Sequence, residues 1–113
     1  MELWQEIESK IQELDASVKN LRKAGTDYAN AEREYKIALK KEVLRLRDSG
    51  MAVTLIPLVV YGNEDIATLR ANRDIKEAVY DANKEAINSI KLQIKVLQEQ
   101  WKQEYGNTKF MEG

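Results

Sequence analysis

The chain contains no cysteine and no histidine, and these two absences exclude most common catalytic and metal-binding designs. Without cysteine there are no disulfides, no thiolate metal ligands and no thiol nucleophile. Without histidine there is no Glu-x-x-His pattern of the kind that binds two metal ions in helical bundles. The five glycines are scattered, so the chain also lacks a glycine-rich phosphate loop. We therefore expect no catalytic residues, no metal site and no cofactor.

An excess of charge of one sign is also missing, because 18 basic side chains nearly balance 19 acidic ones. No long-range field would therefore draw nucleic acid or an anionic membrane to the protein. A basic patch formed by Arg45, Arg47, Arg70, Arg73 and Lys76 could contact phosphates, but acidic residues interrupt it. Nucleic-acid binding is accordingly an unfavoured alternative, which a gel shift at low salt would test.

Long hydrophobic runs are absent as well. The most apolar segment, residues 51–61, has 11 residues and includes Pro57, whereas a membrane-spanning helix needs about 20 apolar residues. The first ten residues carry acidic side chains among the apolar ones and lack the basic region and apolar core of a secretory signal. These observations predict a soluble, cytoplasmic protein with no membrane contact.

The sequence does contain two stripes of apolar residues at alternating spacings of three and four. The first stripe consists of Trp4, Ile7, Ile11, Leu14, Val18 and Leu21. The second stripe consists of Ile87, Ile90, Ile94, Leu97 and Trp101. This heptad spacing predicts two long helices that each bury one narrow face against another helix. We expect an all-α fold.

The first long helix is predicted from Glu2 to about Asp48, because this region is rich in helix-forming residues and contains no proline. Gly25 lies inside it and offers a break point, since glycine costs about 1 kcal/mol against alanine in a helix interior. We prefer a continuous helix. Ser49 and Gly50 are expected to end it, because glycine just beyond the last turn helps to satisfy the terminal carbonyl groups.

A short apolar helix is predicted next, from Leu55 to Tyr61. Thr54 is its expected N-cap, and Pro57 falls in its first turn, where a missing N–H does no harm. A strand over residues 53–60 is the alternative.

The second long helix is expected to begin after Asn63, which is a favourable N-cap, and to continue to about Tyr105. Gly106 and Asn107 are expected to end it. The predicted organisation is a single helical domain over residues 1–107, followed by a flexible tail over residues 108–113.

The two stripes align in an antiparallel register. Three pairs of large residues have numbers that sum to 105, namely Trp4 with Trp101, Ile11 with Ile94, and Val18 with Ile87. A single fold-back near residue 52 satisfies all three pairs, and the turn residues lie within residues 49–54. The sequence therefore predicts an antiparallel, coiled-coil-like helical hairpin with the short apolar helix near its tip.

The centre of the hairpin has two interpretations. If the heptads continue inward, the seam becomes polar and aromatic, with Gly25 opposite Tyr80 and Glu32 opposite Arg73. A charged, aromatic-lined gap of this kind is a candidate site for a small, nucleotide-like ligand. The candidate ligand-binding residues are Tyr28, Glu32, Tyr35, Arg73, Lys76 and Tyr80.

If the heptad instead stutters, the apolar stripe moves onto alanines. These are Ala24, Ala31 and Ala38 on the first helix and Ala71, Ala78, Ala82 and Ala86, together with Ile75 and Val79, on the second. Glu32 and Arg73 would then flank the seam as an ion pair worth about 0 to 1 kcal/mol. We prefer this second interpretation, because small residues recur at helical spacing on both helices.

The apolar residues of the short helix have no place inside a two-helix structure, so we expect them to cover something else. The candidate partner-binding residues are Leu55, Ile56, Leu58, Val59 and Tyr61. A second copy of the chain is the simplest partner, and a foreign protein is the other. Leu92 and Val96, one position off the second stripe, widen the apolar face and also favour a multi-helix homo-oligomer.

Three segments are distinctive beyond their helical patterns: GTDYANAEREYKIALKKEVLRLRDSGMAVTLIPLVVYGN, LRANRD and EAINSIKLQIKVLQEQW. Together they resemble small uncharacterised helical proteins encoded by phages and prophages of Gram-positive bacteria, and GMAVTLIP with YGN carries most of the resemblance. The family brings no established activity and no catalytic residues. The resemblance implies a phage gene expressed in bacterial cytoplasm, where small non-enzymatic proteins often disable host machinery or assist replication and recombination.

These observations favour a non-enzymatic interaction protein, an oligomeric helical hairpin that binds a host or phage protein, with inhibition of a bacterial defence system as one role. One alternative is a helical bundle that sequesters a nucleotide-like signal. The other is an accessory protein of phage replication or recombination that contacts nucleic acid.

Overall fold

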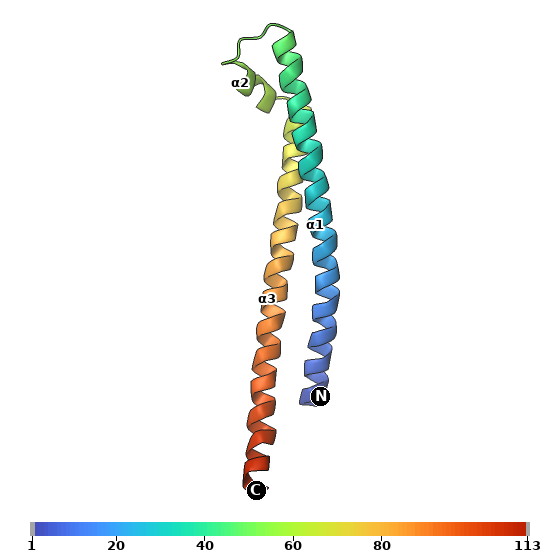
Figure 1. Ribbon diagram of the computed structural model, residues 1–113, viewed down its shortest axis with the longest axis vertical. Helices are drawn as coiled ribbons and strands as arrows, with labels where there is room; N and C mark the ends of the chain where they lie inside the picture. Colours follow the sequence, from blue (N-terminus) through green and yellow to red (C-terminus); the bar gives the residue numbers. More distant parts are fainter. Residues whose placement is uncertain (1, 113) are drawn as a thin grey trace. The chain divides into compact units, whose positions relative to one another are not determined.

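The computed structural model describes residues 2–112, and the side chains of residues 2–106. It contains three α-helices, α1 (Leu3–Asp48), α2 (Ile56–Tyr61) and α3 (Glu64–Glu112), and no strand within residues 2–112 (Figure 1). The all-α prediction is confirmed. The chain divides into two compact units, which we describe separately. Unit 1 comprises residues 1–22 and 81–113, and unit 2 comprises residues 23–80.

Helix α1 runs without a break through Gly25, as predicted, and ends in a Schellman motif. The Gly50 N–H donates to the Arg47 carbonyl oxygen at 3.0 Å, and the Met51 N–H donates to the Leu46 carbonyl oxygen at 3.2 Å. Gly50 has a φ of 86°, in the left-handed region that favours glycine. Met51 packs against the core cluster that contains Leu46. The predicted helix end at Ser49 and Gly50 is confirmed.

Helix α2 confirms the predicted short helix and excludes the strand alternative for residues 53–60. Its N-cap is Leu55, with no side-chain cap, so the prediction that Thr54 caps this helix is wrong. The Leu55 N–H donates to the Ala52 carbonyl oxygen at 2.9 Å, so a backbone turn leads into α2. Pro57 lies in the first turn, as predicted.

Helix α3 begins at the predicted cap. Oδ1 of Asn63 accepts a hydrogen bond from the Ile66 N–H at 3.1 Å, and the Asn63 carbonyl oxygen accepts one from the Ala67 N–H at 2.9 Å. Glu64 and Asp65 occupy the first turn, where their negative charge complements the helix dipole.

The far end of α3 differs from the prediction. The helix continues through Gly106 to Glu112, so the predicted helix end at Gly106 and Asn107 is wrong. A single glycine inside a helix costs only about 1 kcal/mol, which the surrounding helix can absorb. Residues 108–112 of the predicted tail belong to this helix, and Gly113 lies outside the described residues.

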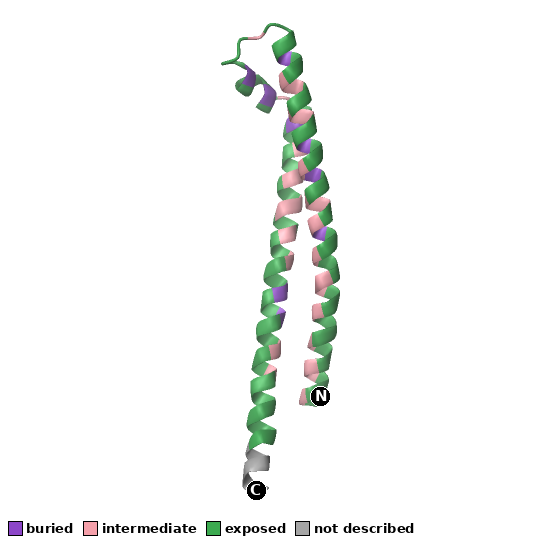
Figure 2. Cartoon of the chain, viewed as in Figure 1, coloured by how far each residue is buried: buried purple, intermediate pink, exposed green. Residues whose placement is uncertain are grey.

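Unit 2 has a core to which all three helices contribute (Figure 2). Its buried members are Tyr35 and Leu46 from α1, Ile56 and Val60 from α2, and Ile66 from α3. Val60 is the most buried, at 2% exposure. The expectation that the apolar residues of the short helix find no place within their own chain is therefore wrong for Ile56 and Val60, because α2 packs against α1 and α3.

Unit 1 is a pair of helical segments with a thin core. Within its described side chains, the buried apolar residues are Ile87 and Ile90. Trp4 and Ile7 of α1 line a groove together with Gln98, Trp101 and Lys102 of α3. Residues near both ends of the chain therefore line one groove, as an antiparallel hairpin predicts, while the exact register of 105 stays a prediction in this unit.

Candidate functional site

Gly25 and Tyr80 meet in the seam of unit 2, as the continued heptads predict. A Cβ atom added at Gly25 would lie 3.1 Å from Cε2 and 3.5 Å from Cδ2 of Tyr80. The glycine therefore makes room for the ring, and the antiparallel register is confirmed in unit 2. The Tyr80 ring also neighbours the Tyr28 ring, with a centroid distance of 6.0 Å and an interplanar angle of 34°.

Arg73 covers the buried ring of Tyr35. Its Cζ atom lies 4.8 Å from the ring centroid, within the range of a cation–π interaction. Arg73 Nε donates to Asp74 Oδ1 at 2.9 Å, and Nη2 lies 2.8 Å from the same oxygen. The hydrogen bond to Asp74 raises the pKa of the Arg73 guanidinium, while desolvation acts in the opposite direction. Arg73 is thus a permanently charged member of the seam.

Glu32 and Arg73 do not take each other as ion-pair partners, contrary to the prediction. Lys36 Nζ lies 3.2 Å from Glu32 Oε1, one turn along α1, and Arg73 pairs with Asp74 on α3. Each helix therefore satisfies these charges along its own surface.

The preferred alanine-packed seam is wrong for α3. Its alanines at positions 71, 78, 82 and 86 are exposed, whereas Arg73, Lys76 and Tyr80 are partly buried. On α1, Ala24 and Ala31 are buried together with Tyr35, so this helix uses both sets of residues. Long basic side chains can replace apolar ones here, because their aliphatic stems cover apolar surface while the charged ends reach water.

The six candidate ligand-binding residues therefore lie in one unit. The structure brings four of them into two pairs, Tyr28 with Tyr80 and Tyr35 with Arg73. Glu32 and Lys76 are partly buried in the same part of the seam. Aromatic rings beside cations suit a planar anionic ligand, and ligand binding at these residues stays a prediction.

At the tip of unit 2, five large apolar side chains face solvent, and we call them the tip surface. They are Val53, Leu55, Leu58, Val59 and Tyr61. Leu58 is 75% exposed and Val53 72%. Four of these residues were among the predicted partner-binding residues, and Val53 was not. Ile56, the fifth predicted residue, is buried in the core and is not available to a partner.

A groove of about 420 Å³ opens between α1 and the tip surface. Its lining is apolar except for Arg47, and includes Leu39, Val43, Val53, Pro57 and Tyr61. Arg47 forms no ion pair with any residue that the structure describes. Arg70 Cζ lies 5.5 Å from the centroid of the Tyr61 ring. Arg47 and Arg70 therefore border the apolar tip, and the exposed acidic residues Asp48, Glu64 and Asp65 lie close to them in the sequence.

One neighbouring charge is already neutralised. Arg45 Nε donates to Glu42 Oε2 at 3.0 Å, and Nη2 donates to Oε1 at 2.6 Å. The hydrogen bond lowers the pKa of the Glu42 carboxyl and raises that of the Arg45 guanidinium. Because this pair is satisfied, Arg45 adds little positive charge to the tip.

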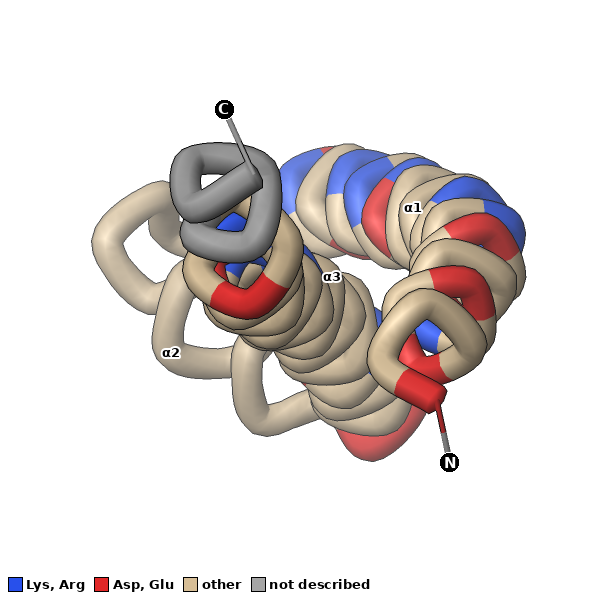
Figure 3. Tube along the Cα trace, turned by 90° about the horizontal axis from the view of Figure 1, so that it is seen from below, with Lys and Arg blue, Asp and Glu red and all other residues tan. Residues whose placement is uncertain are grey.

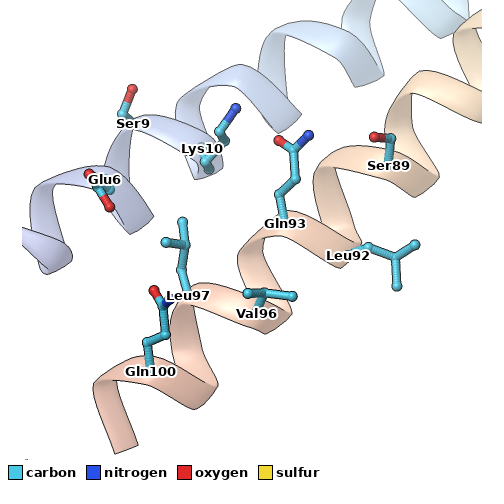
Figure 4. Close-up of a pocket in the computed structure, with 9 residues that line it drawn as sticks. All are labelled: Glu6, Ser9, Lys10, Ser89, Leu92, Gln93, Val96, Leu97 and Gln100. Atoms are coloured by element: carbon cyan, nitrogen blue, oxygen red, sulfur yellow. The ribbon is translucent and has the colours of Figure 1, made fainter. Parts of the chain in front are cut away.

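Unit 1 has an open groove of about 630 Å³ that the sequence reasoning did not identify. Glu6, Ser9 and Lys10 of α1 form one wall. The α3 wall consists of Ser89, Leu92, Gln93, Val96, Leu97 and Gln100 (Figure 4). Figure 4 shows Leu97 pointing toward α1 and Leu92 pointing away from it. The available sequence signal was the apolar pair Leu92 and Val96 beside the main stripe.

Two features are absent from the residues that the structure describes. No group of three or more acidic side chains is arranged to hold a metal ion. No helix within residues 2–112 is both long and apolar enough to span a membrane. No protein-family model, curated protein or solved structure matches the chain.

Proposed function

We propose that this chain is a non-enzymatic, phage-type interaction protein whose tip surface binds another protein. One observation carries the proposal. Helix α2 is anchored by Ile56 and Val60, which are buried in the core, while Leu58, Val59 and Tyr61 of the same short helix face solvent. An apolar surface that is held by buried residues beside a groove resembles the anchor sites of protein interfaces. Contiguous apolar surface of this kind rarely stays exposed in a monomer.

The charge around the tip favours a foreign partner at this surface over a second tip. Arg47 lines the groove without an ion pair among the described residues, and Arg70 covers Tyr61. Two tips facing each other would bring these cations together, and like charges across an interface are unfavourable. We therefore infer a partner that presents bulky apolar side chains beside carboxylates.

The resemblance to phage and prophage proteins implies a host or phage protein of the bacterial cytoplasm as the partner. Inhibition of a bacterial defence system is the role that we propose within that setting. Binding of this kind requires only complementary shape and charge, so it is compatible with a sequence that lacks cysteine and histidine.

The test is capture of a partner from host lysate by the wild-type chain and by two variants. Leu58→Asp places a charge on the tip surface and should abolish capture. Ile37→Asp is the matched control, because Ile37 is also an exposed apolar residue of unit 2 but lies on α1 and does not line the tip groove. Mass spectrometry should identify the same partner with the wild type and the control. Capture that survives Leu58→Asp would remove the tip surface from the proposal.

A second candidate function, sequestration of a nucleotide-like ligand, is supported by the ring pair of Tyr28 and Tyr80 near Lys76 in the seam. Titration calorimetry with cyclic and linear nucleotides tests it. Binding heat that the wild type shows with a nucleotide and the Lys76→Gln variant does not would support this function. Absence of heat in protein that is helical by circular dichroism would exclude it for the nucleotides tested.

A further inference from the structure

The groove of about 420 Å³ between α1 and the tip surface, which we call the tip groove, has a row of basic side chains along one side. Lys36, Lys40 and Arg47 of α1 form this row, and we call it the basic row. Their spacings of four and seven place them on one side of the helix, and Arg47 itself lines the groove. All three are exposed. Figure 3 shows basic segments at intervals along α1, with uncharged segments between them.

Two members of the basic row are available to an outside partner. Lys40 and Arg47 form no ion pair with any residue that the structure describes. Lys36 is paired with Glu32, whose Oε1 lies 3.2 Å from its Nζ. Unit 2 therefore leaves the two positive charges nearest the tip without a carboxylate of its own.

No acidic side chain among those that the structure describes lines the tip groove. Glu34 and Glu42 of α1 each lie two positions from a member of the basic row, and residues two apart on a helix do not face each other. Asp48, Glu64 and Asp65 are exposed and close to the tip in the sequence, but none of them lines the groove. The charge that lines the groove is therefore basic.

Both walls of the tip groove are helical. Leu39, Val43 and Arg47 are spaced by four on α1, and Pro57 and Tyr61 by four on α2. An extended peptide would find no sheet edge for its backbone, because residues 2–112 contain no strand. A helix satisfies its own backbone hydrogen bonds and can lay an apolar face into a groove of this kind. The groove therefore suits a helix better than an extended segment.

We propose that the tip groove receives an acidic amphipathic helix of the partner protein. Its apolar face packs on Leu39, Val43 and Pro57, and its carboxylates pair with Lys40 and Arg47. At 1.5 Å per residue the basic row extends over about 16 Å, so a helix of about three turns is long enough. The inference rests on the proposed function, in which the tip surface binds another protein, and it names the segment by which that protein is recognised.

The combination of apolar walls and basic charge favours a protein segment over nucleic acid. Most contacts that proteins make with DNA go to phosphate and sugar, and such a ligand would leave the apolar walls of the tip groove uncovered. An amphipathic helix supplies both apolar side chains and carboxylates. A second copy of the tip supplies the apolar side chains but brings Arg47 against Arg47, which is unfavourable.

Fluorescence anisotropy with two labelled synthetic peptides tests the proposal. Both are helical peptides of about 15 residues with leucines at spacings of three and four along one face, which spans slightly more than the basic row. One peptide carries glutamates beside the leucines, and the other carries lysines at the same positions. The wild-type chain should bind the glutamate peptide at least about tenfold more tightly than the lysine peptide.

Charge reversal at the basic row should invert this preference. Arg47→Glu and Lys40→Glu should each weaken binding of the glutamate peptide about tenfold, because repulsion replaces attraction, and should strengthen binding of the lysine peptide. Circular dichroism must show that each variant is helical. If Arg47→Glu is not, Arg47→Gln replaces it and should weaken binding of the glutamate peptide about threefold.

Lys41→Glu is the matched control. Lys41 is exposed and has no ion pair among the described residues, as Lys40 does. It lies two positions from Leu39, however, and so on another side of α1 from the groove. The substitution changes the net charge of the chain by the same amount and should leave both affinities within about twofold, because salt screens distant charges.

Four results overturn the proposal. They are no binding of the glutamate peptide to the wild type, equal affinity for the two peptides, equal losses in Lys40→Glu and Lys41→Glu, and binding of a labelled DNA duplex in place of the glutamate peptide. A change in mass by light scattering in Arg47→Glu would also overturn it, because it would indicate a second copy in the groove.

The proposed function can stand when this inference fails. Leu58 belongs to the tip surface but does not line the tip groove. Capture from lysate that is abolished by Leu58→Asp and unchanged in Arg47→Glu would keep the tip surface as a binding site and remove the acidic helix. Loss of capture in both variants, together with binding of the glutamate peptide, would support both.

Discussion

Unit 2 and unit 1 are built from segments of the same two long helices, yet they bury very different numbers of side chains. Unit 2 contains seven of the buried apolar residues, and the described part of unit 1 contains two, Ile87 and Ile90. The difference comes from the short helix α2, which belongs to unit 2. In unit 2, α2 places Ile56 and Val60 against both long helices, whereas unit 1 has no comparable segment among its described residues.

The comparison shows that heptad spacing makes residues available for burial but does not bury them. Trp4 and Ile11 are members of the first heptad stripe, yet both side chains remain exposed in unit 1. Two helices enclose little volume between them, so large seam residues keep contact with water unless another helix covers them. We therefore expect unit 2 to hold most of the stability of the isolated chain.

The largest expected effect comes from a direct test of this difference. Ile56→Ala should lower the free energy of unfolding by about 3 kcal/mol, because it leaves a cavity in the core of unit 2. Ile11→Ala in unit 1 should lower it by less than about 1 kcal/mol, because Ile11 is already exposed. Urea unfolding followed by circular dichroism measures both.

Equal losses in the two variants would show that the units do not differ in stability as proposed. The same experiment addresses the prediction of a single domain over residues 1–107. One transition shared by probes in both units would support it, and two separate transitions would contradict it.

The second test concerns the N-terminal caps of α2 and α3, the two helices that begin in unit 2. Asn63→Ala should lower the free energy of unfolding by about 1 kcal/mol, because it removes the acceptor for the Ile66 N–H at the start of α3. Thr54→Ala should change it by less than about 0.5 kcal/mol, because α2 has no side-chain cap. A larger loss for Thr54→Ala than for Asn63→Ala would restore Thr54 as a cap.

The third test sharpens the account of the seam in unit 2. Gly25→Ala should gain up to about 1 kcal/mol from helix propensity, but the new Cβ would approach the Tyr80 ring to 3.1 Å. In the Tyr80→Ala background the full gain should appear. A double-mutant cycle should therefore give a coupling of about 0.5–1 kcal/mol, and a coupling of zero would mean that the glycine does not make room for the ring.

The smallest effect is electrostatic. The hydrogen bond from Arg45 lowers the pKa of Glu42, so its stabilising contribution is present at neutral pH and is lost as the pH falls through this lowered pKa. Arg45→Gln should raise the pKa of Glu42 toward its ordinary value, which a carboxyl NMR titration can follow. An unchanged titration midpoint would show that the Arg45 contact does not perturb Glu42 in solution.

Several helix ends were predictable from the sequence, because residues close together in the chain determine how a helix begins and ends. Gly50 adopts the left-handed conformation that ends α1, and Asn63 caps α3. Two predictions that also looked local were wrong. Thr54 does not cap α2, and Gly106 does not end α3, because a backbone turn replaces a side-chain cap in the first case and a helix tolerates one glycine in the second.

The candidate sites were predictable only in part. Gly25 opposite Tyr80 followed from the register, and exposure of Leu58 followed from the lack of room for a third apolar segment between two helices. Burial of Ile56 did not follow, because it depends on α2 folding back onto both long helices. The choice between a polar seam and an alanine seam on α3 was open for the same reason, since both patterns have helical spacing.

The sequence was enough to predict two long antiparallel helices with a fold-back near residue 52. The helices and the turn depend on residues close together in the chain, and the pairing of the helices followed from one repeated spacing and the register sum of 105. The packing of three helices decided which apolar side chains leave water. It buried Ile56 and Val60, kept Leu58 exposed, and left the alanines of α3 facing outward. Burial is a property of volumes enclosed by several elements at once, and no single helical pattern contains that information.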